Sequence, residues 1–250
     1  MPRAFISLAA AAAMAGLFTA TAAAQTATFS GEQKTAIEKI VRDYLISHPE
    51  VLQEAVAELE KRQTAAEADK SKAAIAQNRD ALLRSPRQVT LGNPDGDVTL
   101  VEFFDYNCGY CKHALGDMLA LLKSDPKLRV VLKEFPVLGP GSVEAAQIAV
   151  AVRMQDKSGK KYLDFHQKLL GGRGQADRAK ALAAAKDAGL DMARLEKDSK
   201  SPEVRETLDE SMKLAEALGI NGTPSYVIGD KMLPGAVGLP ALKDQIAASR

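Results

Sequence analysis

The chain has 250 residues, of which 46% are hydrophobic and 26% are charged, and its formal net charge is +1. This length suffices for one sizeable core and an accessory segment. The near-neutral charge excludes an extended field of one sign that would attract nucleic acid or a polyanionic substrate. Tryptophan is absent and aromatic residues make up only 5%, which argues against base-stacking surfaces.

The first 24 residues have the layout of a secretory signal peptide. Arg3 gives a weakly positive start, residues 5–18 form an Ala/Leu-rich apolar run, and Ala22 to Ala24 supply small residues before a cleavage site near Gln25. A membrane anchor is the alternative, but the apolar run is short and rich in alanine. We therefore predict that residues 1–24 are a cleaved signal and that the protein is exported to the periplasm, where two thiols can persist as a disulfide.

Residues 25–59 are predicted to form helices with one apolar face. Ser30 and Gln33 have the spacing of a capping box. The first helix should end near Ser47-His48-Pro49, because proline disfavours helical geometry in the residue before it and can open the next helix. The apolar positions of the two helices are Ile37, Ile40, Val41, Tyr44, Leu45, Val51, Leu52, Val56 and Leu59.

Residues 60–86 are rich in Ala, Lys, Glu, Gln and Asp, a composition typical of a solvated helix or a semi-rigid linker. The preceding segment, 25–59, has too little apolar surface to fold separately. Its apolar face must bury either against the main domain or against copies of itself. Because the charged linker separates this face from the main core, we expect it to be an oligomerisation segment.

The central motif of the chain is a strand that leads into a helix. Leu100 to Phe104 form a short apolar, aromatic and β-branched run that predicts a buried strand, and from Lys112 onward apolar residues recur at helical spacing. The only two cysteines, Cys108 and Cys111, fall at this junction. Cys108 should therefore lie at a helix N-terminus, where unpaired N–H groups and the helix dipole favour a thiolate.

Four kinds of site contain a Cys-x-x-Cys pair. A zinc site needs four ligands, and the chain offers only His48, His113 and His166 besides the two cysteines. Haem attachment requires histidine directly after the second cysteine, where Lys112 stands. A structural disulfide that closes so short a loop would constrain the unfolded chain very little. The strand-to-helix context therefore favours a redox centre. His113, near the cysteines, could tune them electrostatically or be an ordinary half-exposed residue, and we assign no chemistry to His48 and His166.

The rest of the chain alternates strand and helix signals. Residues 88–91 and 128–135 are predicted strands, and another strand follows Gly222-Thr223-Pro224. Helical periodicity or a high Ala/Leu content marks the stretches 142–154, 162–170, 176–188, 202–218 and 239–248. Strands thus bracket a block of helices, which predicts an α/β fold with a helical insertion at about 140–218.

Two segments resemble known families. The run from Val101 to Lys112, Val-Glu-Phe-Phe-Asp-Tyr-Asn-Cys-Gly-Tyr-Cys-Lys, and the later Gly-Thr-Pro-Ser-Tyr of residues 222–226 resemble the DsbA-like branch of the thioredoxin superfamily. Residues 44–52, Tyr-Leu-Ile-Ser-His-Pro-Glu-Val-Leu, resemble the N-terminal region of ScsC-type proteins, the periplasmic suppressor-of-copper-sensitivity group. The resemblance implies that residues 87–250 form a thioredoxin domain interrupted by a helical subdomain.

The resemblance also implies roles for particular residues. Pro224 would be the cis-proline that faces the cysteines, Thr223 would offer main-chain hydrogen bonds to a bound peptide, and Glu102 would be a buried acid beneath the cysteines. ScsC-like relatives imply a homotrimer that acts as a disulfide isomerase on misoxidised or unfolded exported proteins and is kept reduced by a membrane thiol reductase. The Gly109-Tyr110 dipeptide departs from the Pro-His of the best-known oxidase, so strong oxidising power is not carried over.

The residues by themselves leave other interpretations open. Pro224 could be an ordinary turn proline, because cis bonds are only about 5–6% of X-Pro bonds. Strand alternation would point Glu102 outward. Tyr106 and Tyr110 could contact unfolded substrates, or they could be packing residues.

We expect Cys108 to be the attacking thiolate and Cys111 the thiol that resolves the mixed disulfide. Glu102, if buried, could carry protons to and from Cys111. No cofactor and no resident metal ion are assigned. The alternatives are a DsbA-like dithiol oxidase, a copper-binding protein that uses the same soft thiolates, and a periplasmic scaffold whose N-terminal segment is its main feature.

Overall fold

The computed structural model describes residues 29–156 and 158–250. The chain divides into two compact units, one that ends at Glu58 and one that comprises Leu59–Arg250. The predicted signal peptide, residues 1–24, lies outside the described residues. Every helix among the described residues is too short or too polar to cross a bilayer.

The N-terminal helices begin and end at the predicted signals. Helix α1 spans Gly31–Ser47, and Ser30 caps it: the Ser30 hydroxyl accepts from the Gln33 N–H at 3.2 Å, and the Gln33 side chain accepts from the Ser30 N–H at 2.9 Å. The helix ends at His48, and α2, Glu50–Gln77, starts after Pro49. None of the residues of α1 is buried. Its predicted apolar face is therefore exposed to solvent in this chain.

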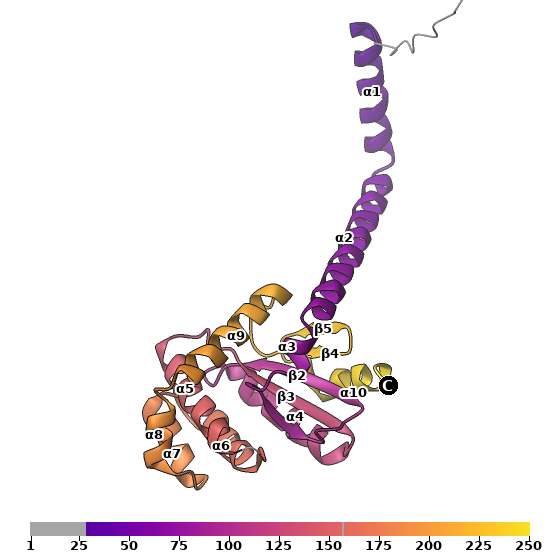
Figure 1. Ribbon diagram of the computed structural model, residues 1–250. Helices are drawn as coiled ribbons and strands as arrows, with labels where there is room; N and C mark the ends of the chain where they lie inside the picture. The colour runs from indigo at the N-terminus through magenta and orange to yellow at the C-terminus, as the bar shows by residue number, and fades with distance from the viewer. Residues whose placement is uncertain (1–28, 157) are drawn as a thin grey trace, which may run out of the picture. The chain divides into compact units, whose positions relative to one another are not determined.

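A mixed five-stranded sheet forms the centre of the second unit (Figure 1). The strands are β1 (Val89–Gly92), β2 (Val98–Phe104), β3 (Leu128–Glu134), β4 (Ser225–Ile228) and β5 (Lys231–Pro234), in the order β1-β3-β2-β4-β5. The central pair, β2 and β3, is parallel, and every other neighbouring pair is antiparallel. A parallel pair needs a crossover, which is supplied by α4 (Gly109–Ser124).

Both faces of β2 are covered. Leu100 and Phe104 belong to the larger core cluster, which also contains residues of α4 and of the C-terminal helix α10 (Gly238–Ala248). Val101 and Phe103 point to the opposite face and belong to a second cluster. The sequence of this strand is therefore nearly continuously apolar, as expected for a central strand with helices on both sides.

Five helices between β3 and β4 form the helical insertion. They are α5 (Pro140–Gln155), α6 (Lys160–Leu170), α7 (Arg178–Asp187), α8 (Met192–Asp198) and α9 (Pro202–Leu218). Helix α8 has seven residues, too few for its periodicity to be recognised in the sequence, and Asp191 caps it by accepting from the Arg194 N–H at 3.1 Å. The mixed α/β arrangement and the N-terminal helices confirm the predicted fold class.

The charged linker, residues 60–86, is not solvated throughout. Ile75 near the end of α2 and Leu82 in the short helix α3 (Arg79–Leu83) are buried in the second core cluster, together with residues of α9 such as Leu214. The Lys133 side chain, itself buried, donates to the Ala81 carbonyl at 2.7 Å. Ile75 and Leu82 are seven residues apart in a charged segment, so they form no recognisable apolar pattern in the sequence. In the structure they cover a sheet face that would otherwise be exposed.

We therefore expect the substitution Leu82→Ala to lower the free energy of unfolding of the second unit by about 2–5 kcal/mol, because a leucine that is only 1% exposed leaves a cavity. Leu138→Ala is the matched control, since Leu138 is 50% exposed and its loss should cost about 0.5 kcal/mol or less. Urea unfolding of both variants measures the difference. Equal losses would mean that α3 does not contribute to the core.

Candidate active site

Cys108 is the N-cap residue of helix α4. Its backbone is extended, its N–H donates to the Asp105 carbonyl at 3.1 Å, and its sulfur accepts from the Cys111 N–H at 3.4 Å. The sulfur therefore takes the position that a serine or aspartate oxygen takes at an ordinary helix N-cap. At this position, the free N–H groups and the dipole of the helix stabilise a thiolate.

A distant segment of the chain meets Cys108 from the other side. The Thr223–Pro224 peptide bond is cis, and it precedes β4. The Thr223 carbonyl accepts a hydrogen bond from the Cys108 thiol at 3.1 Å. Pro224 is thus the cis-proline expected from the family resemblance, and the carbonyl group before it lies within hydrogen-bonding distance of the Cys108 sulfur.

Cys111 lies one helical turn further on and is completely buried, and both cysteines are free thiols. Burial raises the pKa of the Cys111 thiol far above its usual range. A hydrogen bond from the Asp105 main chain acts in the opposite direction, and the nearby Glu102 carboxyl group raises the pKa further. The two sulfurs are therefore unequal, because Cys111 stays a neutral thiol while the Cys108 sulfur lies among helix N–H groups.

Glu102 lies in the middle of β2, between Leu132 of β3 and Tyr226 of β4. Its side chain points to the same sheet face as Leu100 and is only 3% exposed, so the outward orientation that strand alternation suggested is wrong. The side chains of β2 do alternate between the two faces of the sheet, but both faces of this central strand are covered, so neither is exposed to solvent. Burial raises the pKa of Glu102 to about 8, and the charge of Asp117 on α4 adds to the rise.

The two tyrosines of the motif differ in exposure. Tyr110 follows Cys108 in the first turn of α4 and is 70% exposed, so its ring is available to a bound polypeptide. Tyr106 is buried, and the suggestion that it contacts substrate is wrong. Its hydroxyl lies 3.3 Å from the Tyr162 hydroxyl and 3.2 Å from Nδ1 of His166.

Tyr106 belongs to a buried polar cluster that the sequence did not reveal. The Glu134 carboxyl group accepts from the Tyr162 hydroxyl at 2.7 Å, and burial raises the pKa of Glu134 to about 8. Burial also lowers the pKa of His166 to about 3, so this imidazole is neutral. The cluster joins β3, the active-site turn and α6. The signal available in the sequence was Glu134 at the end of a strand whose centre is apolar. His113, in contrast, is exposed on α4.

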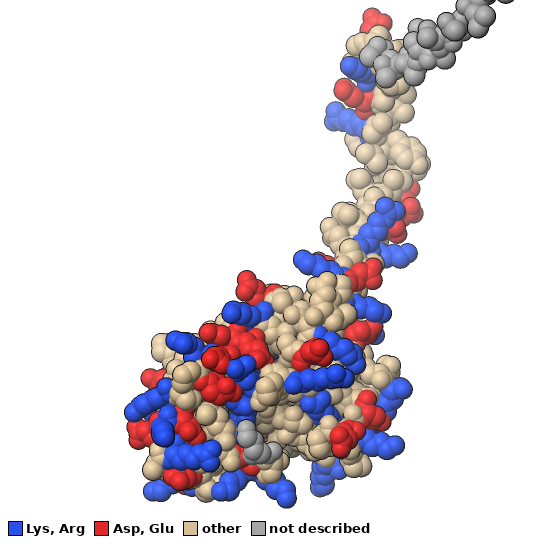
Figure 2. Space-filling view, in the orientation of Figure 1, with Lys and Arg blue, Asp and Glu red and all other residues tan. Residues whose placement is uncertain are grey.

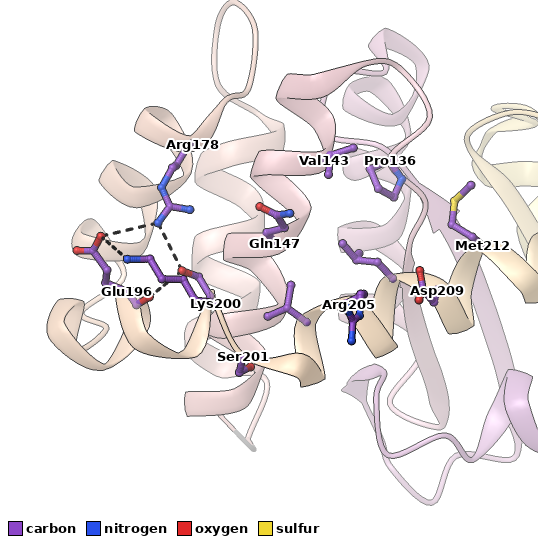
Figure 3. Close-up of a pocket in the computed structure, with 13 residues that line it drawn as sticks. Pro136, Val143, Gln147, Arg178, Glu196, Lys200, Ser201, Arg205, Asp209 and Met212 are labelled. Carbon is purple, nitrogen blue, oxygen red and sulfur yellow. Dashed lines mark hydrogen bonds and ion pairs between the residues drawn. The ribbon is translucent and has the colours of Figure 1, made fainter.

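A cavity of about 820 Å³ lies away from the cysteines, between α5, α8 and α9 (Figure 3). At one end Arg178 and Lys200 converge on Glu196, whereas Val143, Pro136 and Met212 lie towards the other end (Figure 3). The cavity contains none of the predicted site residues. Basic and acidic side chains are interspersed over the visible face of the second unit (Figure 2), in keeping with the net charge of +1.

The arrangement of a cysteine pair at a helix N-terminus opposite a cis-proline can be compared with known families. Residues 99–247 match the family model of the DSBA-like thioredoxin domain. The chain belongs to this family. Residues 33–66 match a second model, the N-terminal domain of the copper resistance protein ScsC. The predicted resemblance to both groups is confirmed.

Solved structures of DSBA-like and related proteins agree with this assignment. A thioredoxin-like oxidoreductase from Silicibacter pomeroyi is 45% identical, covering 69% of this chain and 98% of that one, with a TM-score of 0.65. A linker-deletion mutant of ScsC from Proteus mirabilis is 30% identical, covering 90% of this chain and 98% of that one, also with a TM-score of 0.65. The predicted class, thiol:disulfide oxidoreductases, is therefore confirmed for the family.

Among curated proteins, disulfide bond formation protein D of Bacillus subtilis is 28% identical, covering 68% of this chain and 82% of that protein. The sodium/proton antiporter NhaA of Herminiimonas arsenicoxydans is 30% identical over 162 residues, which is 64% of this chain and 25% of the antiporter. The chain thus spans about a quarter of the length of the first curated relatives it matches. The similarity to these antiporters concerns only part of each of them.

The buried Glu102 predicts a pH dependence of stability. Its pKa in the folded protein, about 8, lies above the ordinary value of 4.5, so between about pH 5 and 8 the folded state holds a proton that the unfolded state has lost. The free energy of unfolding should therefore fall as the pH rises through this window. The substitution Glu102→Gln should make this fall shallower, by up to about 1.4 kcal/mol per pH unit.

Urea unfolding at a series of pH values measures this slope. Glu216→Gln, at an exposed position on α9, is the control and should leave the slope unchanged. An unchanged slope in Glu102→Gln would show that Glu102 is ionised in the folded protein at neutral pH.

Proposed function

We propose that this protein catalyses thiol-disulfide exchange on exported proteins in the periplasm, chiefly as a disulfide isomerase or reductase. The observation that supports this best is the position of Cys108, whose sulfur lies between the N-terminus of α4 and the Thr223 carbonyl, with Cys111 buried one turn behind it. The helix N-terminus favours the attacking thiolate of Cys108, and burial keeps Cys111 protonated until the mixed disulfide has formed.

The reaction begins when the Cys108 thiolate attacks one sulfur of a substrate disulfide. A bond forms between Cys108 and that sulfur, the substrate S–S bond breaks, and the other substrate sulfur leaves as a thiolate. In isomerisation, a substrate thiolate then attacks the mixed disulfide, which forms a new substrate disulfide and returns Cys108 as a thiolate. No net oxidation or reduction occurs in this cycle.

In reduction, Cys111 attacks the Cys108 sulfur instead. This releases the reduced substrate and leaves a Cys108–Cys111 disulfide, which a membrane thiol reductase would have to reduce again. Cys111 must lose its proton to attack, and its pKa is raised by burial. Glu102 is the proposed proton acceptor in its ionised form, whose population grows as the pH rises towards its pKa of about 8, because it is buried on the same face of the sheet and interacts electrostatically with Cys111.

The substrate is proposed to bind as an extended segment beside the sulfur. Thr223 and Pro224 supply main-chain contact on one side of Cys108, and the exposed ring of Tyr110 supplies apolar contact next to it. Such contacts do not depend on a particular sequence, which suits an enzyme that acts on misoxidised or unfolded proteins.

The N-terminal helices are proposed to hold three copies of the chain together. Ile37, Ile40, Val41 and Tyr44 are exposed on α1, and α1 has no buried residue. An exposed apolar face of this kind normally marks an interface. The match of residues 33–66 to the ScsC N-terminal domain supports a trimer. Several thiol centres on one assembly favour isomerisation, because neighbouring centres can act on one substrate.

Two alternatives use the same sulfurs. A dithiol oxidase would start from the Cys108–Cys111 disulfide and would oxidise reduced substrate without correcting wrong disulfides. Copper binding would use both thiolates as soft ligands. In residues 29–156 and 158–250, however, no group of three or more His, Cys, Asp or Glu side chains is placed to hold a metal ion.

The roles of the two cysteines predict different defects. Cys108→Ser should reduce the recovery of native protein from a scrambled, fully oxidised substrate to the uncatalysed rate, because no attacking thiolate remains. Cys111→Ser should keep the first attack and accumulate the mixed disulfide, which can be trapped with acid and detected by mass. If Cys108→Ser retained exchange and Cys111→Ser lost it, the assigned roles would be reversed.

The oligomerisation segment predicts a second outcome in the full-length chain. Ile37→Glu should dissociate the oligomer in sedimentation analysis and reduce isomerase activity, because it places a charge in the centre of the apolar face. Ile46→Glu is the matched control: it lies nine positions later, about two and a half turns of α1 and hence on the opposite side, and is also exposed. An unchanged mass in both variants would contradict self-association through this face.

A further inference from the structure

The turn before Cys108 contains a buried carboxylate whose role is not accounted for by the exchange reaction. Asp105 is 1% exposed and accepts four hydrogen bonds. Oδ1 accepts from the Asn107 N–H at 2.7 Å and from the Ser142 hydroxyl at 2.7 Å, and Oδ2 accepts from the N–H groups of Val137 and Leu138 at 2.9 and 3.0 Å. All four donors are neutral, and this set suits an ionised carboxylate, which can only accept.

Asn107 makes a second connection from the same turn. Its Nδ2 donates to the Ser142 hydroxyl and to the Ala176 carbonyl, both at 2.9 Å, and its Oδ1 accepts from the Ala176 N–H at 2.7 Å. The side chain therefore pairs with the main chain of residue 176 in both directions. Ser142 lies between Asp105 and Asn107 and bonds to both.

Most partners of Asp105 and Asn107 belong to the helical insertion or to the segment that leads into it. Residues 137 and 138 form the connection from β3 into the helical insertion, Ser142 is in the first turn of α5, and Ala176 precedes α7. The turn is also connected to the cysteines: the Asp105 carbonyl accepts from the Cys108 N–H at 3.1 Å, and the Asp105 main chain lowers the pKa of Cys111 against the larger effect of burial. A single turn thus connects the insertion to both cysteines.

We propose that Asp105 and Asn107 are positioning residues, which fasten the turn that carries Cys108 to the helical insertion and thereby set the reduction potential of the cysteine pair. The inference rests on the proposed exchange function and adds a task for the insertion, namely to hold the cysteine sulfur at the end of α4.

The physical reason is geometric. The Cys108 sulfur gains from the helix N-terminus while it lies close to the N–H groups of the first turn, and it accepts from the Cys111 N–H at 3.4 Å. A turn released from Ser142 and Ala176 would let the sulfur move away from the N–H groups of α4. The thiolate and hence the reduced form would lose stabilisation, so the pair would become more reducing.

Asn107→Ala tests this in the full-length protein, because it removes three side-chain hydrogen bonds without changing the charge. Asn93→Ala is the matched control. Asn93 also joins two segments, donating to the Pro126 carbonyl at 3.3 Å and accepting from the Asp95 N–H at 3.0 Å, but it has no hydrogen bond to the active-site turn. Both variants should lose thermal stability, so stability alone does not decide between a positioning role and a structural one.

The deciding readouts are equilibration of the cysteine pair with glutathione and titration of the Cys108 thiolate by its ultraviolet absorbance. We expect Asn107→Ala to favour the disulfide at least tenfold more than the wild type does, which corresponds to about 30 mV, and to move the thiolate titration to higher pH. Asn93→Ala should leave both at wild-type values. Ser142→Ala, which removes only the shared hydroxyl, should move both in the same direction by less.

The proposal is overturned if Asn107→Ala and Asn93→Ala give the same potential and the same thiolate titration. If Asn107→Ala does not fold, the comparison of Ser142→Ala with Asn93→Ala decides by the same criterion. Failure of the proposed function looks different, because the wild-type protein would then not exchange with glutathione or with a substrate disulfide. In that case the thiolate titrations of Asn107→Ala and Asn93→Ala would still test the positioning role.

Discussion

The chemistry of this protein depends on one interaction, the hydrogen bond that the Cys111 N–H donates to the Cys108 sulfur at the start of α4. It gives the sulfur the place of a helix N-cap oxygen, where a negative charge is stabilised. The Thr223 carbonyl meets the same sulfur from a segment more than a hundred residues later in the chain. The sheet makes this meeting possible, because β2 and β4 are neighbours and both lead to this end of the sheet.

Three acidic side chains are buried near this centre, and they differ in their hydrogen-bond partners. Asp105 is surrounded by four donors and connects the active-site turn to the helical insertion. Glu134 shares a cluster with two tyrosines and a neutral histidine. The Glu102 carboxyl group makes no hydrogen bond to another described residue, and burial raises its pKa to about 8. An acid left without donors is suited to gaining and losing a proton, whereas an acid with four donors is suited to holding a loop.

Several parts of the fold followed from local patterns. The capping box at Ser30, the break at Pro49 and the buried strand before the cysteines are short-range signals, and the structure has all three. Other expectations needed distant parts of the chain. The burial of Leu82 within a charged linker depends on a sheet face that α9 covers only partly, and α8 was too short to show a period. The sequence leaves open whether Tyr106 packs or contacts substrate, because its partners on β3 and α6 are not visible from its neighbours.

The sequence by itself determined that two cysteines stand where a strand leads into a helix, because apolar spacing and the Cys-x-x-Cys interval are local properties. Only the tertiary structure decided which way Glu102 points, what holds the Asp105 carboxylate and which carbonyl meets Cys108. Each of these depends on side chains or main-chain groups that are far away in the sequence. Burial and hydrogen bonding, and with them the pKa of a buried group, arise only when such segments come together.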